Sequence, residues 1–232
     1  MLGVRTMLAL ALVGLTAAAS HAAILAESTF DTDDEGWMVS GTSVATPARL
    51  FDPTTSDGWI EAFGFQPLIA FEAPTKFLGN QSAAFGGQLD LELRLGFSDG
   101  SGTTDPLVIL SDGTTSLQFR STPPTLFEWT PLTVPLVASA GWQLFDGSGN
   151  PGPAASDAQL QAVLGNLARL AVNVDWNAPG GPTDGGDDIT DLDNVRLISG
   201  PAAPVPEPST LTLALAGAGA LVTAARLRRS RR

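Results

Sequence analysis

The stretch from Gln88 to Phe97 alternates strictly between apolar and polar residues. A period of two is that of a β-strand with one face in a core and the other in water. The apolar side chains are predicted to share one face and the charged ones the other, with Leu89, Leu91, Leu93, Leu95 and Phe97 opposite Asp90, Glu92 and Arg94. Burying one leucine contributes about 1.5–3 kcal/mol, so this strand is predicted to anchor the core.

Clusters of glycine, aspartate, serine and proline interrupt the chain on both sides of that strand, as at Ser56-Asp57-Gly58 and Ser111-Asp112-Gly113. Short apolar or alternating runs lie between these turn signals. Many short strands separated by turns predict an all-β fold, either a sandwich or a barrel. Further strands are expected at Trp37–Val44, Gly58–Phe63, Leu68–Glu72, Pro106–Leu110, Thr115–Arg120, Leu126–Leu136, Gly141–Phe145, Leu170–Asp175 and Asp193–Ile198.

One short helix is predicted between residues 157 and 168. Ser156 and Gln159 have the spacing of a capping box, in which each side chain bonds the backbone N–H of the other residue. Apolar residues then recur at helical spacing, at Leu160, Val163, Leu164 and Leu167. We interpret this stripe as a face packed on the core rather than a binding surface.

Residues 1–22 have the order of a secretory signal peptide. Arg5 precedes an apolar run, Met7–Thr16, and small residues follow it. Ser20 and Ala22 satisfy the small-x-small rule, so cleavage is predicted after Ala22. The alternative is an N-terminal membrane anchor or a core helix, but an apolar run of about ten residues is too short to span a bilayer.

The C-terminal tail has three parts, which are Val205-Pro206-Glu207-Pro208, an apolar segment over Leu211–Ala225, and a terminal arginine cluster. This order resembles the PEP-CTERM sorting tail of Gram-negative bacteria. The resemblance implies an exosortase-type processing enzyme, a transient helix in the inner membrane, and delivery to the cell surface or extracellular matrix. The arginines place the body outside the cytoplasm. A permanent C-terminal anchor is the alternative.

These features divide the chain into four parts. They are a signal peptide (1–22), a β-sandwich domain (23–199), a linker with the Pro-Glu-Pro motif (200–208) and a sorting and transmembrane segment (209–232). The signal peptide and the last segment are both expected to be helical.

The composition excludes several functions. The formal net charge is −12, and half of the 12 basic residues lie in the two ends, so the body is strongly acidic and repels nucleic acid. Cysteine is absent, and the one histidine, His21, lies in the signal peptide. A mature protein without either residue has no Ser-His-Asp triad, histidine zinc site or cysteine nucleophile. We therefore predict a protein that is not an enzyme.

Three segments of the body resemble the laminin B (laminin IV type A) domain in its bacterial versions. They are Phe30–Trp37, Phe71–Leu89 and Leu192–Leu197, and the middle one is the most specific. Residues 155–175 also fit the strand–helix–strand ending of that family. The resemblance implies a jelly-roll β-sandwich similar to galactose-binding and carbohydrate-binding modules, and it implies no catalytic residues.

Acidic residues near the first strand suggest a structural calcium site. Asp31, Asp33 and Glu35 alternate before Gly36 as in an EF-hand loop, but the twelfth position is Thr42, so an EF-hand is excluded. In jelly-roll domains related to the laminin B family, an acidic segment near the first strand and an aspartate in the last strand can bind one structural Ca²⁺ together. This implies Asp31, Asp33 or Asp34 together with Asp193. The alternative is an exposed acidic turn. The acidic loop Asp184–Asp188 is a second candidate, either for Ca²⁺ or for sugar hydroxyls, and its alternative is a flexible solvated loop.

Sugar stacking is the second candidate chemistry, because tryptophan rings offer a flat apolar face. Most of the five tryptophans are expected in the core, and Trp176, beside Asp175 and Asn177, is the best candidate for a sugar. The preferred function is a secreted, non-catalytic domain that binds extracellular polysaccharide in a biofilm matrix. The alternatives are a structural or adhesive domain that contacts other proteins, and a carboxylate-based glycoside hydrolase.

Overall fold

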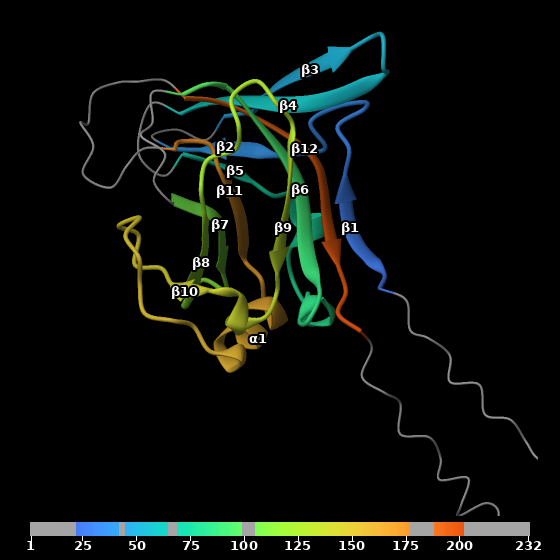
Figure 1. The fold of residues 1–232 in the computed structure, drawn as a ribbon. Helices are drawn as coiled ribbons and strands as arrows, with labels where there is room; N and C mark the ends of the chain where they lie inside the picture. The colour runs from blue at the N-terminus through green and yellow to red at the C-terminus, as the bar shows by residue number, and fades with distance from the viewer. Residues whose placement is uncertain (1–21, 42–44, 65–68, 99–104, 177–187, 202–232) are drawn as a thin grey trace, which may run out of the picture.

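The computed structural model describes residues 22–41, 45–64, 69–98, 105–176 and 188–201. Two six-stranded antiparallel sheets face one another in this part of the chain, with one α-helix at one end (Figure 1). The predicted all-β sandwich with a single short helix is therefore confirmed for the described residues. The predicted signal helix, apart from Ala22, and the predicted membrane helix lie outside them.

Sheet A contains the first and the last strand. Its strand order is β3 (Ala48–Asp52), β4 (Asp57–Gly64), β12 (Asp188–Ile198), β6 (Gln88–Phe97) and β9 (Thr130–Pro135), and β1 (Ile24–Ser28) also pairs with β12. The long strand β12 therefore occupies the centre of the sheet. It pairs with β6 on one side, and with β4 and then β1 on the other.

Sheet B is built from shorter strands. Its order is β10 (Gln143–Leu144), β8 (Ser116–Ser121), β7 (Asp105–Ser111), β11 (Arg169–Asn173), β5 (Ala70–Glu72) and β2 (Met38–Ser40). Single 3₁₀ turns occur at Thr75–Phe77, Ser82–Ala84 and Ala138–Ala140.

The core lies between the two sheets and contains the leucines of β6. Leu89, Leu91, Leu93 and Leu95 are all buried, so the predicted half-buried strand is confirmed. Phe97 differs from the prediction, because 49% of it is exposed. A β-bulge shifts the register between the pairs Thr190–Leu95 and Ile189–Phe97, and the extra residue turns Phe97 out of the core alternation.

The helix α1 (Asp157–Gly165) begins at the predicted capping box. The backbone N–H of Ser156 donates to Gln159 Oε1 at 2.9 Å, and the N–H of Gln159 donates to Ser156 Oγ at 3.3 Å. The helix ends three residues before the predicted limit, since the chain turns after Gly165 to enter β11. Leu160, Val163 and Leu164 are buried, as expected for a stripe packed on the core.

The sequence prediction missed two strands and extended two others too far. β1 and β3 were not predicted, because neither segment alternates clearly. The run Leu126–Leu136 forms a strand only over Thr130–Pro135, and β2 covers only Met38–Ser40. Conversely, β12 starts at Asp188, five residues before the expected Asp193.

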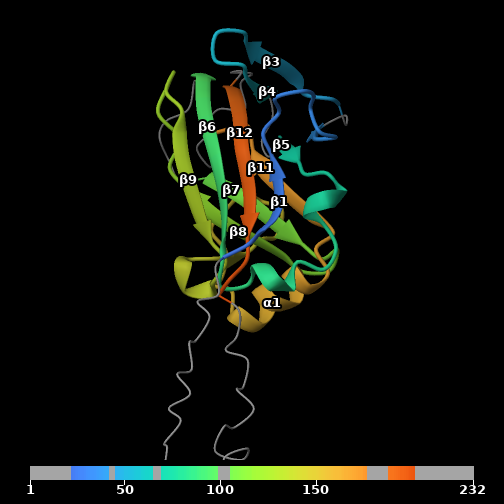
Figure 2. The ribbon, with the colours of Figure 1, turned by 90° about the vertical axis from the view of Figure 1, so that its right-hand side faces the viewer.

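The two ends of the described body lie side by side. The N–H of Ser199 donates to the carbonyl of Ala23 at 2.8 Å, and the N–H of Ala23 donates to Ser199 Oγ at 2.8 Å. Both ends lie at the end of the sandwich that carries α1, away from the β3–β4 hairpin (Figure 2). Within the described residues, no helix is long and apolar enough to cross a membrane.

Candidate binding face on the outside of sheet A

The outer surface of sheet A faces the viewer in Figure 2, and strand pairing arranges its side chains in rows. Glu61 on β4 lies directly opposite Asp191 on β12, and Asp191 lies directly opposite Arg94 on β6. Alternation along each strand puts all three side chains on the face that points away from sheet B. They form the polar row of this surface.

Two tryptophans surround Arg94 in this row. The guanidinium carbon lies 5.0 Å from the ring centroid of Trp59 and 4.7 Å from that of Trp129. The two rings meet edge to face, with centroids 6.1 Å apart and planes at 77°. Arg94 therefore occupies the corner between two aromatic rings, a geometry in which cation–π attraction stabilises the charge. We call Trp59, Arg94 and Trp129 the aromatic corner.

A buried carboxylate lies beneath the aromatic corner. Arg94 Nε donates to Asp191 Oδ2 at 2.8 Å, and Trp59 and Glu61 also hydrogen-bond the carboxylate with smaller effects on its pKa. Burial raises the pKa of Asp191 despite the opposing effect of Arg94. Burial and the charge of Asp191 also raise the pKa of Glu61. Arg94, Asp191, Trp59 and Glu61 thus form one connected polar cluster at the corner.

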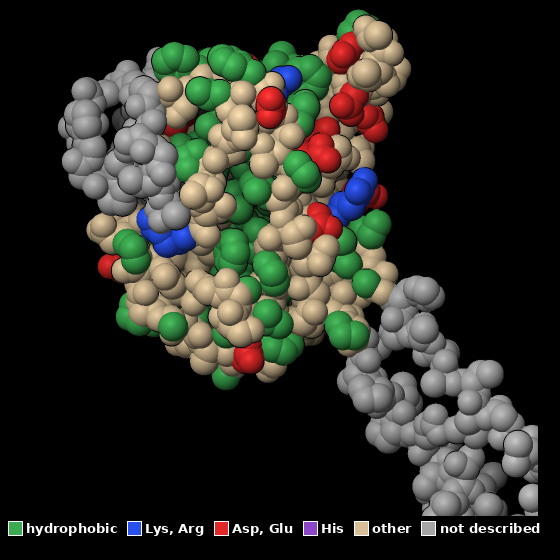
Figure 3. All heavy atoms as spheres, in the orientation of Figure 1, with side chains coloured by type: hydrophobic (Ala, Val, Ile, Leu, Met, Phe, Trp, Pro, Cys, Tyr) green, Lys and Arg blue, Asp and Glu red, His purple; other side chains and the backbone are tan. Residues whose placement is uncertain are grey.

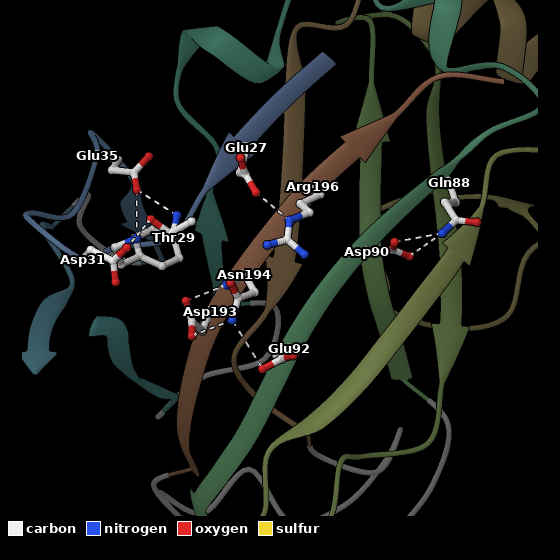
Figure 4. Close-up of polar contacts among 11 residues, drawn as sticks. Glu27, Thr29, Asp31, Glu35, Gln88, Asp90, Glu92, Asp193, Asn194 and Arg196 are labelled. Atoms are coloured by element: carbon white, nitrogen blue, oxygen red, sulfur yellow. Dashed lines mark hydrogen bonds and ion pairs between the residues drawn. The ribbon is translucent and has the colours of Figure 1, made fainter. Parts of the chain in front are cut away.

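The next row toward the middle of the sheet is acidic. Asp193 lies opposite Glu92 and is buried, and it accepts from the backbone N–H of Asn194 at 2.6 Å and from Asn194 Nδ2 at 3.0 Å (Figure 4). Burial is the main cause that raises the pKa of Asp193 to about 7. The charges of Asp57, Glu92 and Asp31 add to this rise, and the hydrogen bond from the backbone of Asn194 opposes it. No cation among the described residues pairs with Asp193.

The row nearest α1 is internally paired. Arg196 Nε donates to Glu27 Oε1 at 2.6 Å, which raises the pKa of Arg196. Asp90 accepts from Gln88 Nε2 at 2.8 Å and 2.9 Å (Figure 4). It also accepts from Thr133 Oγ1 at 2.8 Å. These contacts pair the charged groups of this row with one another or with polar neighbours.

The proposed calcium ligands mostly bond within their own turn. Asp33 Oδ1 accepts from the N–H of Glu35 at 2.8 Å, and Asp34 Oδ1 accepts from the N–H of Gly36 at 2.9 Å. Asp31 accepts from Thr29 Oγ1 at 3.0 Å, and its charge also acts on Asp193. The described residues contain no group of three or more acidic or histidine side chains placed to hold a metal ion. Calcium therefore stays a prediction.

Trp176, the residue predicted to stack on a sugar, has its ring fully buried in the hydrophobic core and so offers no exposed face in this structure. The N–H of Trp176 donates to Asp188 Oδ2 at 2.6 Å, which fixes this residue at the start of β12. Asp175 is also buried, and Asn177 lies outside the described residues. Of the acidic loop, only Asp188 is described, and it is buried.

The aromatic corner was missed in the sequence, although one signal was present. Trp59 and Glu61 occupy alternate positions of β4, whose other positions, Gly58, Ile60 and Ala62, are buried. This alternation places Trp59 on the outer face. Trp129 lies just before β9, far away in sequence, and only the fold brings it to Trp59. The sorting-motif residues Val205, Pro206, Glu207 and Pro208 lie outside the described residues.

Two packed antiparallel sheets with an aromatic and charged outer face define this body as a β-sandwich module. The chain belongs to the laminin B (domain IV) family, which matches residues 70–207. Residues 204–229 match the PEP-CTERM protein-sorting motif, which marks an exported surface or extracellular protein and implies an exosortase as its processing enzyme. Both resemblances found in the sequence are thereby confirmed.

The comparisons also found individual proteins that are similar to this chain. The chain is 26% identical over 181 residues to laminin subunit gamma-1 of Danio rerio, which covers 76% of the chain but only 10% of that relative. The L4b domain of human laminin alpha-2 superposes with a TM-score of 0.56 at 12% identity, over 75% of this chain and 96% of that domain. A family 11 carbohydrate-binding module of a Clostridium thermocellum cellulase gives a TM-score of 0.40 at 12% identity, over 81% of this chain and 91% of that module.

Proposed function

We propose that this protein is exported, held briefly in the inner membrane by residues 209–232, and cleaved at the tail by an exosortase-type enzyme. The sorting motif at residues 204–229 supports this route. Mass spectrometry of the mature C-terminus tests it. The expected mature chain lacks everything after the Pro-Glu-Pro region, and an intact arginine tail would show a permanent anchor instead.

We further propose that the mature sandwich binds extracellular polysaccharide without cleaving it, through the outer face of sheet A. The observation that carries this proposal is the aromatic corner, where two partly buried tryptophans flank an arginine. A pyranose ring has an apolar C–H face that packs on an aromatic ring, and hydroxyl groups at its rim that both donate and accept hydrogen bonds.

The terminal nitrogens of Arg94 at the corner match those hydroxyls. Arg94 bonds Asp191 through Nε alone, so its two terminal nitrogens have no acceptor among the described residues. They are held as a planar fork of donors, which suits neighbouring hydroxyl oxygens. The acidic groups around the corner disfavour anionic sugars such as uronates. A neutral polysaccharide is therefore the ligand that this surface fits best.

A glycosidase role is not favoured by the carboxyl groups of the polar row. Glycoside hydrolysis needs two carboxyl groups on opposite sides of the scissile bond, about 5–9.5 Å apart. Glu61 and Asp191 instead lie next to each other on directly paired residues, and each alters the pKa of the other. This arrangement leaves no space for a glycosidic bond between them.

Affinity gel electrophoresis tests the binding proposal with the purified mature domain. Gels contain a neutral polymer, namely hydroxyethylcellulose, xylan, galactomannan or dextran, or the acidic polymer polygalacturonate. Wild type should be retarded by at least one neutral polymer. Trp129→Ala should lose about tenfold or more in affinity, since stacking on one aromatic ring contributes about 1–3 kcal/mol in comparable systems.

A second variant tests the planar N–H donors of Arg94. Arg94→Lys keeps the charge and the contact with Asp191 but loses the planar fork, so its retardation should also fall. Thermal melts of each variant separate loss of binding from loss of folding. If folded Trp129→Ala runs as wild type on the retarding polymer, the aromatic corner is not the binding site.

Calcium belongs to the same proposal as a structural ion. Asp193 and Asp31 are near enough for their charges to interact, and a divalent cation between them would relieve that repulsion. Its test is developed in the Discussion.

A further inference from the structure

An apolar row adjoins the polar row on its side farthest from α1. Phe63 on β4 lies opposite Ile189 on β12, and Ile189 lies opposite Phe97 on β6. Each phenylalanine is 49% exposed, whereas outer-face residues of the rows nearer α1 are mostly charged. The three side chains therefore extend the surface of the aromatic corner with an uncharged strip.

The β-bulge of β6 creates this row. The pairs Leu95–Thr190 and Phe97–Ile189 leave Gly96 as the extra residue, and the bulge turns Phe97 to the outer face. A Cβ on Gly96 would lie 3.3 Å from Ile189 Cγ2, so a larger residue would push against the row. Glycine at position 96 thus avoids a side chain that would press against Ile189, between the two phenylalanines of the row.

The loop that carries Trp129 contributes a further aromatic ring. The N–H of Phe127 donates to the carbonyl of Leu95 at 2.7 Å, which ties this loop to β6. Phe127 has φ of 64° and is 72% exposed, an unfavourable backbone conformation for a bulky residue that gains little from burial. Hydrophobic side chains are visible at this end of the molecule and elsewhere on the face drawn in Figure 3.

We propose that the aromatic corner and the apolar row form one continuous binding strip, which holds an internal stretch of a neutral polysaccharide chain across several sugar units. This rests on the proposed function. Neighbouring strands lie about 4.8 Å apart and successive rows about 7 Å apart, so the strip crosses β6, β12 and β4 and is longer than one sugar ring.

The chemistry of the strip favours a sugar polymer over a protein partner. Apolar rings alternate with donors and acceptors on a flat surface, as a chain of pyranose rings alternates C–H faces with hydroxyl groups. The acidic row formed by Asp193 and Glu92 borders the strip on its other side. This row repels uronate and sulfate groups, so the occupant is expected to be uncharged.

The test combines two strip variants with a matched control. Phe63→Ala and Phe97→Ala each remove one ring of the apolar row. Phe51→Ala removes a ring of similar exposure, 45%, from β3, where pairing with Gly58 places it on the opposite face of the hairpin. Retardation on the neutral polymer that binds wild type should weaken about tenfold in both strip variants and remain unchanged in the control.

Oligosaccharides prepared from the same polymer then report the length of the strip by calorimetry. Affinity should rise from the disaccharide to the hexasaccharide in wild type, and this rise should disappear in Phe97→Ala. The affinity for the disaccharide should be similar in both proteins.

The outcomes separate this proposal from the broader one. Failure of wild type to bind any neutral polymer overturns the proposed function and the strip together. Binding that Phe63→Ala and Phe97→Ala leave unchanged overturns the strip alone. Equal retardation by polygalacturonate overturns the requirement for a neutral ligand. Dissociation of a wild-type dimer by Phe97→Ala, seen by light scattering with polymer binding intact, would make the row a contact between copies and also overturn the strip.

Discussion

Asp193 offers a direct test of the electrostatics of the outer face. Its pKa rises from an ordinary 3.8 to about 7 in the folded protein. Between these values the folded state keeps a proton that the unfolded chain has released. The stabilisation from this proton is fully present below about pH 4 and is lost as the pH rises through 7. Wild type should therefore become less stable from mildly acidic to neutral pH.

Asp193→Asn removes this penalty while keeping the shape of the side chain. A span of about three pH units at about 1.4 kcal/mol each sets an upper limit near 4 kcal/mol at pH 8. We expect the variant to be more stable than wild type by about 2–4 kcal/mol at pH 8 and equal to it at pH 4. For a domain of this size that corresponds to a melting temperature about 5–15 °C higher.

Urea unfolding of both proteins at intervals from pH 4 to pH 8 measures the difference directly. Asp112 provides the opposite control, because the backbone N–H groups of Thr115 and Thr114 lower the pKa of its carboxyl group. Asp112→Asn should lose stability at neutral pH and not at low pH. If Asp193→Asn is as stable as wild type or less stable at pH 8, the charged carboxylate of Asp193 does not destabilise the folded protein, and the reasoning is refuted.

Three further outcomes are expected. Millimolar Ca²⁺ at pH 8 should raise the melting temperature of wild type and not of Asp193→Asn, whereas no effect of Ca²⁺ or of a chelator on wild type would remove the calcium prediction. Ser156→Ala should cost about 1 kcal/mol in urea unfolding, since it removes the cap of α1, and no loss would show that the capping box is dispensable. Gly87→Ala should severely reduce the yield of folded protein, because its Cβ would lie 2.1 Å from the carbonyl oxygen of Ile198. Gly113→Ala, with open space around it but an unfavourable φ of 89°, should be milder.

Patterns in the sequence predicted the parts of the fold that depend on residues close together in the chain. The alternation of Gln88–Phe97 and the capping box of α1 are both local, and both are confirmed. The strands β1 and β3 have no such pattern, because their pairing partners, β12 and β4, determine their structure. Phe97 departs from the alternation because of a bulge that pairing with β12 creates.

The candidate site was harder to predict because it depends on contacts between distant residues. Trp176 is followed by polar and glycine residues, which suggests exposure, yet the start of β12 covers it and Asp188 binds its backbone. Trp59 and Trp129 are 70 positions apart, and neither has a neighbour that indicates a site. Only the order of β4, β12, β6 and β9 in sheet A brings the two rings to Arg94.

Both ends of the described body leave the sandwich at the same end, so a tether at the C-terminus would orient the sandwich. Ala23 and Ser199 are hydrogen-bonded beside Gln88, at the start of β6, whereas Arg94 lies six residues farther along, roughly 20 Å away. A body tethered through the residues after Pro201 would point its aromatic corner away from the tether. The same face would then meet the surroundings whether the molecule is attached or free, and many copies on one surface would all display it outward.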